Sequence, residues 1–129
     1  MTAIKKKHID ELHFEHTLWI NQLKFYRDEL KVYQKRLEEI ASKNNKLEVR
    51  SQIESFQNKF IRQNEVIDTL IHDINAHESK LAEAAKANPT AIHRELFDNH
   101  DSHEDEINTF VKIYKELKTD YTKFSVEWM

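Results

Sequence analysis

The chain has 129 residues, of which 33% are charged, and it contains no glycine, no cysteine and one proline. This length is enough for one domain with a buried core, and the composition favours long helices over sheets. The formal net charge of −3, without an extended basic face, excludes a nucleic-acid-binding protein. The lack of cysteine excludes disulfides and thiolate metal ligands.

The hydropathy pattern excludes a membrane protein. No apolar run approaches the roughly 20 residues that a membrane-spanning helix needs. The first twelve residues, MTAIKKKHIDEL, lack the apolar segment of a signal peptide. We therefore expect a cytoplasmic protein with neither a membrane nor nucleic acid as its partner.

The first predicted element is a helix over residues 4–43. Its apolar side chains recur at intervals of three and four residues, which is the spacing of a coiled-coil seam. The seam consists of Ile9, Leu12, His16, Trp19, Leu23, Tyr26, Leu30, Tyr33, Leu37 and Ile40. The Ser-Lys-Asn-Asn sequence at 42–45 predicts the end of this helix, with an asparagine in the left-handed conformation.

Two further helices follow, over residues 46–87 and 89–127. Asn45 and Glu48 have the spacing of a capping box for the second helix, and Asn88 with Pro89 predicts the start of the third. The second seam consists of Val49, Ile53, Phe56, Phe60, Gln63, Ile67, Leu70, Ile74, His77, Leu81 and Ala84. The third consists of His93, Leu96, His100, His103, Ile107, Phe110, Tyr114, Leu117, Tyr121, Phe124 and Trp128.

The predicted fold is a single all-α domain over residues 1–129, an antiparallel bundle of three long helices. Because the connections are short, the heights of residues can be estimated by folding the sequence back at each turn. This register places Gln63 level with Tyr26 and Tyr114. We expect the buried glutamine amide to hydrogen-bond the two tyrosine hydroxyls.

The same register gathers histidines from all three helices. His16, His77, His100 and His103 fall on the seam in two adjacent layers, where leucine would be more stabilising. His13 lies one turn from His16. Carboxylates lie near these histidines: Asp73 is one turn before His77, Glu104 is one turn after His100, and Glu15, Glu78 and Glu106 flank the seam.

A divalent metal ion would compensate for this burial, because it binds neutral imidazole nitrogen directly. Helical bundles build iron, manganese and zinc sites from such inward-facing ligands. The predicted ligands are His13, His16, His77, His100, His103, Glu104 and Asp73. The sequence does not indicate which of the three metals binds.

Several functions fit this pattern. A metal-binding bundle with open coordination positions could handle O₂ or peroxide, which leaves enzymatic activity undecided. With a closed shell, the site would be structural or serve metal storage or sensing. The alternative is a non-enzymatic coiled-coil interaction protein whose core histidines form a pH-sensitive packing layer.

One segment and one surface need a separate explanation. Residues 99–107, NHDSHEDEI, combine two seam histidines with weak helix formers, so we expect a kink or fraying there until a metal binds.

The first helix also carries a second apolar stripe, formed by Phe14, Leu18, Phe25 and Val32. We expect a homodimer through this stripe; the alternative is a broad core that partly covers it.

Overall fold

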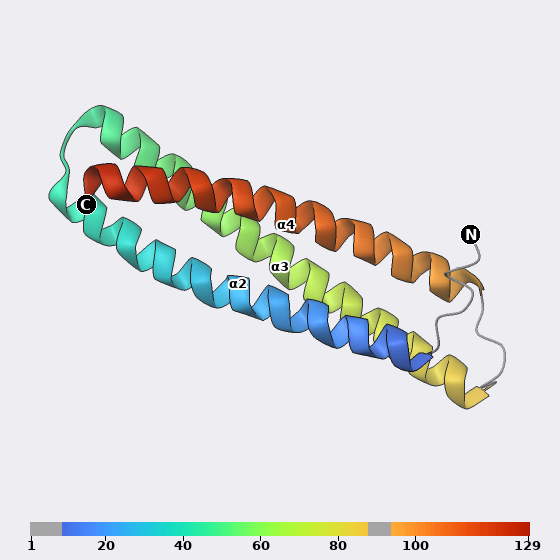
Figure 1. Cartoon of the computed structure of the whole chain (residues 1–129). Coiled ribbons are helices and arrows are strands. Elements are labelled where there is room, and N and C mark those ends of the chain that lie inside the picture. The colour runs from blue at the N-terminus through green and yellow to red at the C-terminus, as the bar shows by residue number, and fades with distance from the viewer. Residues whose placement is uncertain (1–8, 88–93) are drawn as a thin grey trace.

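The computed structural model describes residues 9–87 and 94–129 and forms a bundle of three long helices (Figure 1). They are α2 (Ile9–Lys43), α3 (Leu47–Ala87) and α4 (Arg94–Trp128), and the described residues contain no strand. Each helix runs antiparallel to the one before it in the chain. The predicted three-helix bundle is confirmed. Residues 4–8 and 89–93, predicted as helical, lie outside the described residues, as do Asn88 and its predicted cap.

The turn between α2 and α3 differs from its prediction. No residue of the described chain has a positive φ, so the expected left-handed asparagine is wrong. Instead the Asn44 side chain donates hydrogen bonds to the carbonyl oxygens of Ile40 (2.8 Å) and Trp128 (3.3 Å). This side chain caps the end of α2 and joins it to the end of α4. The first bond of α3 runs from Arg50 N–H to Lys46 O, so Lys46 takes the position predicted for Asn45.

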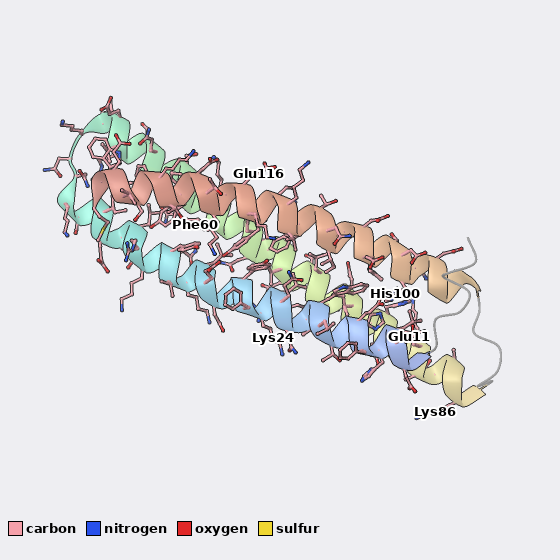
Figure 2. All side chains as sticks on the ribbon, in the orientation of Figure 1. Glu11, Lys24, Phe60, Lys86, His100 and Glu116 are labelled. Carbon is pink, nitrogen blue, oxygen red and sulfur yellow. The ribbon has the colours of Figure 1, made fainter. Side chains whose placement is uncertain are left out.

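The distal half of the bundle has an apolar core that follows the predicted register. Two layers that this register brings together, Leu30/Phe60/Leu117 and Leu37/Ile53/Phe124, are buried. Aromatic rings link them along the axis, with Phe60 pointing inward between the helices (Figure 2). This continuous aromatic packing fixes the heights of the three helices relative to one another.

The two central tyrosines pack together as predicted but choose other polar partners. The ring centroids of Tyr26 and Tyr114 lie 4.3 Å apart. Tyr114 donates a 2.5 Å hydrogen bond to Glu29, and the Tyr26 hydroxyl accepts one from Gln22. The structure records no hydrogen bond from Gln63 to either tyrosine. The predicted hydrogen bonds of Gln63 are wrong because Gln22 and Glu29 of α2 bond the two tyrosine hydroxyls instead. Gln63 is half exposed and faces a surface groove.

Helix α4 runs without a break through residues 99–107. The segment is helical although it contains weak helix formers, and its dependence on a bound metal stays a prediction. Burial of His100 and Ile107 on the inner face supplies the tertiary packing that overrides local propensity. None of the three described helices is long and apolar enough to cross a membrane.

The second stripe on α2 faces outward. Phe14, Leu18, Phe25 and Val32 expose 61%, 49%, 59% and 62% of their surface. A broad core that covers the stripe is therefore excluded.

Candidate metal centre

Three buried histidines, one from each helix, meet near the end of the bundle that lies away from the α2–α3 turn. His16 of α2, His77 of α3 and His100 of α4 expose only 2%, 3% and 1% of their surface. Each offers one ring nitrogen, and these nitrogens all lie within 4.8 Å of one another. The three come together because each occupies a seam position at the same height.

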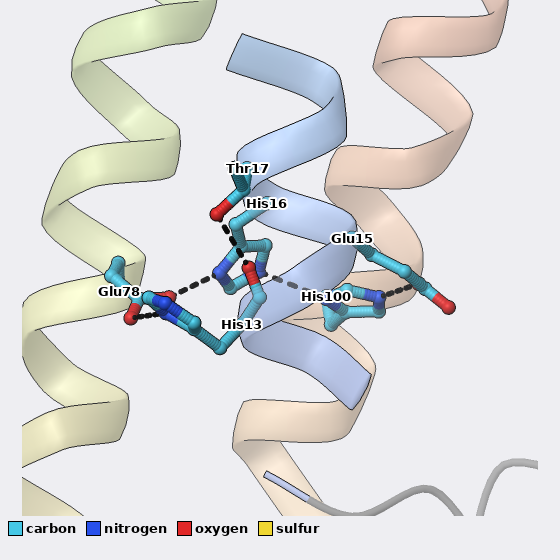
Figure 3. Close-up of polar contacts among 6 residues, drawn as sticks. All are labelled: His13, Glu15, His16, Thr17, Glu78 and His100. Carbon is cyan, nitrogen blue, oxygen red and sulfur yellow. Dashed lines mark hydrogen bonds and ion pairs between the residues drawn. The ribbon is translucent and has the colours of Figure 1, made fainter. Parts of the chain in front are cut away.

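Two of the histidines form the centre of a hydrogen-bonded row (Figure 3). His16 Nδ1 lies 2.6 Å from Glu78 Oε1, and His16 Nε2 lies 3.0 Å from His100 Nδ1. His100 Nε2 lies 2.6 Å from Glu15 Oε1. The row therefore runs carboxylate, imidazole, imidazole, carboxylate.

The row requires one more positive charge than neutral imidazoles provide. Its three contacts need three protons, whereas two neutral imidazoles carry only two. Ionised carboxylates only accept, so the outer nitrogens of His16 and His100 donate to Glu78 and Glu15. The two inner nitrogens then face each other as lone pairs. A proton or a metal ion between them would relieve this contact.

His77 lacks a hydrogen-bond partner where one is needed. Its Nε2 atom is buried and has no hydrogen-bond partner. The ring lies against His16 and His103, with centroid distances of 5.1 Å to each. Burial, together with the charges of the neighbouring histidines, lowers the pKa of His77 to about 4. His77 is thus held as a neutral imidazole, the form that binds metals.

Glu78 and His16, at one end of the row, shift each other's pKa. Burial lowers the pKa of His16 below its ordinary value, while the hydrogen bond to Glu78 opposes this effect. Burial raises the pKa of Glu78, but the hydrogen bonds from His16 and His13 outweigh it and keep the pKa below its ordinary value. Glu78 therefore stays ionised beside a neutral His16.

Trp19 forms a wall of the cluster. Its ring stacks on His100 at 4.8 Å between centroids and lies 5.5 Å from His16. The side chain is half-buried, so it separates the imidazoles from solvent on that side.

Four other residues were predicted as ligands. His103 and His13 contact residues of the cluster, whereas Asp73 and Glu104 do not. His103 packs on His77 and its buried Nδ1 atom has no hydrogen-bond partner, although Glu106 lies 3.4 Å away in poor hydrogen-bond geometry. His13 is exposed and contacts the cluster only through Glu78. Asp73 and Glu104 are half-buried and make no hydrogen bond or ion pair with other described residues. His8 and His93 lie outside the described residues.

Glu15 and Glu78, rather than Asp73 and Glu104, make the carboxylate contacts with the buried histidines. Each directly neighbours a seam histidine in the sequence and reaches across to a histidine on another helix. Residues that flank a coiled-coil seam commonly pair across helices in this way. That position beside a seam histidine was the signal in the sequence for these two contacts, whereas Asp73 and Glu104 stay predicted ligands.

Comparison with known proteins gives no relative. No protein family, curated protein or solved structure matches the chain. The function must therefore be argued from the histidine cluster itself.

Proposed function

We propose that this bundle binds a divalent transition-metal ion through His16, His77 and His100. The observation that carries the proposal is the pair of inward ring nitrogens on His16 and His100, 3.0 Å apart, with a carboxylate holding the far side of each ring. Metal-bound histidines almost always donate their other N–H to a carboxylate or carbonyl. The row is arranged as such a site would be.

The distances are compatible with coordination after a small adjustment. Two nitrogens bound tetrahedrally at about 2.0–2.1 Å from zinc are separated by about 3.3 Å. The His16–His100 separation of 3.0 Å is already close to this value. With the three nitrogens within 4.8 Å, His77 needs to approach by no more than roughly 1.5 Å. Such a shift would also give the Nε2 atom of His77, which has no hydrogen-bond partner, a metal ion to bind.

The donor set favours some of the expected metals over others. Imidazole nitrogen suits zinc and ferrous iron, whereas manganese prefers oxygen donors. The nearest carboxylates, Glu15 and Glu78, already accept hydrogen bonds from the imidazoles. We therefore favour zinc or ferrous iron. Three neutral histidine ligands leave a fourth coordination position on the metal ion. A water molecule in this position would permit O₂ or peroxide chemistry, whereas a protein ligand there would give a structural, storage or sensing site.

The competing function uses a proton in place of the metal. The same row is complete when one imidazolium lies between Glu15 and Glu78, and the lowered pKa of His77 makes this end of the bundle acid-sensitive. The protein would then be an interaction module with a pH-responsive histidine layer.

One experiment separates the two functions. The protein is prepared without a histidine tag, analysed for bound metals and titrated with Co²⁺ and Zn²⁺. Binding in the parent, its loss in His77→Leu and its retention in a variant of the exposed His72, His72→Leu, would support the metal site. If the parent binds neither ion and His77→Leu only raises the melting temperature, the packing-layer function stands and the metal proposal fails.

A further inference from the structure

The ligands proposed above are almost inaccessible. His16, His77 and His100 expose at most 3% of their surface, and Trp19 covers the cluster on one side. An ion that binds there needs a route from solvent. Such a route requires a polar group that is both accessible to solvent and in contact with a ligand.

His103 meets both conditions. It exposes 18% of its side chain, far more than the triad, and its ring lies 5.1 Å from that of His77. Its Nδ1 atom is buried without a hydrogen-bond partner, and so is His77 Nε2. Two imidazole nitrogens without hydrogen-bond partners therefore lie on packed rings, one in the triad and one on the more exposed His103 beside it.

A groove runs along the surface between α3 and α4, and its lining includes Glu106, which lies beside His103. It has a volume of about 480 Å³, and its lining includes Ser102, Asp105, Glu106, Leu70 and Arg62. Glu106 lies 3.4 Å from His103 Nδ1 and is half exposed. The carboxylates at this end of the groove create a negative potential that concentrates cations.

Resting on the proposed metal function, we propose that His103 and Glu106 form the uptake route for the metal ion. The ion first binds at Glu106 and His103 at the surface and then passes to His77 and the rest of the triad. His103 acts on the rates of binding and release. It is not a ligand of the final complex, so it does not set the affinity.

The test is stopped-flow Co²⁺ binding, followed by visible absorption, in the full chain. In His103→Ala we expect the association and dissociation rate constants to fall together by about tenfold, with less than a threefold change in Kd and an unchanged Co²⁺ spectrum. His72→Ala, which removes an exposed histidine from α3, should leave both rate constants unchanged. Circular dichroism checks that each variant folds, and His103→Gln replaces the alanine variant if it does not.

Glu106→Gln tests the electrostatic part. Its association rate constant should fall at low ionic strength and return toward the parent value as salt is added, because salt screens surface charge. A changed Kd and spectrum in His103→Ala would make His103 a ligand and overturn the proposal, as would unchanged rate constants. If the parent binds no Co²⁺, the metal function itself fails and the route falls with it.

Discussion

At the residue scale, the imidazoles and the carboxylates of the proposed site have different roles: the imidazoles offer nitrogen ligands, and the carboxylates hold the imidazole rings. The rings of His16 and His100 direct one nitrogen inward and have the other held by Glu78 and Glu15. Neither carboxylate needs to touch an ion to affect its binding. Each fixes the tautomer and the orientation of its ring, and each makes the inward nitrogen more basic.

Glu78→Gln should therefore weaken metal binding without changing the fold. The amide is a weaker acceptor than the carboxylate, and loss of such an outer partner lowers metal affinity by on the order of 10- to 100-fold. Competitive titration of Zn²⁺ against a chromophoric chelator measures the effect. The matched control is Glu83→Gln, which changes an exposed acid of the same helix. Equal affinities in the two variants would contradict the role given to Glu78.

The metal-free protein should lose stability as the pH falls from about 6.5 to about 4. In this range the unfolded chain protonates His77, whereas the folded chain, with its lowered pKa of about 4, does not. The unfolded state binds more protons, so acid favours it, by up to about 3 kcal/mol for a pKa difference of this size.

Urea unfolding at a series of pH values, with chelator present, gives this dependence. His77→Leu should flatten the slope between pH 6.5 and 4 and raise the stability at neutral pH, since it removes a buried polar atom that has no partner. A parent protein whose stability is constant over this range would show that His77 does not titrate as its burial implies.

At the element scale, the helices are held by different chemistry in their two halves. Toward the α2–α3 turn the seam is aromatic and aliphatic, and Asn44 ties two helix ends together. Toward the other end the same seam carries histidines. Helix α4 spans both regions, and its 99–107 segment contains weak helix formers.

Removal of metal should loosen α4 unevenly. Amide hydrogen exchange of residues 99–107 should accelerate when a chelator is added to the metal-loaded protein, because packing of His100 is what supports this segment. Exchange at residues 117–124, in the apolar half, should not change. Uniform acceleration along α4 would mean that the ion stabilises the bundle as one cooperative unit.

The sequence was sufficient to predict this architecture because its apolar spacing is regular. The height of Tyr26 beside Tyr114 and the meeting of histidines from three helices followed from seam positions and short turns. The polar partners did not follow. Gln22 and Glu29 hydrogen-bond the tyrosine hydroxyls that were predicted as partners of Gln63. His16 contacts both His77 and His100, so the histidines do not separate into two distinct layers. Side chains that flank a seam have several reachable partners, and sequence spacing does not rank them.

At the scale of the whole molecule, the exposed apolar stripe of α2 is the surface through which we expect the chain to bind a second copy. Leu18, Phe25 and Val32 recur at intervals of seven residues and are half exposed or more. An antiparallel pairing about a two-fold axis at Phe25 would set Leu18 of one copy opposite Val32 of the other. Such a contact is self-complementary and closes at two copies.

We expect a homodimer that Phe25→Asp converts to a monomer, because the substitution places two carboxylates on the symmetry axis. Sedimentation velocity over a range of protein concentrations measures the change. Val126→Asp is the control, since Val126 is also exposed but belongs to α4. A parent chain that remains monomeric at high concentration would refute the dimer.

The proposed centre joins parts of the chain that are far apart in sequence. His16 and His100 are separated by 84 residues. An ion bound by both closes a long loop, which a disordered chain could close only at a large cost in conformational entropy. The ligands therefore assemble after the helices have docked. In kinetic terms, the ion should slow unfolding while leaving the folding rate nearly unchanged, because it stabilises contacts that form after the transition state.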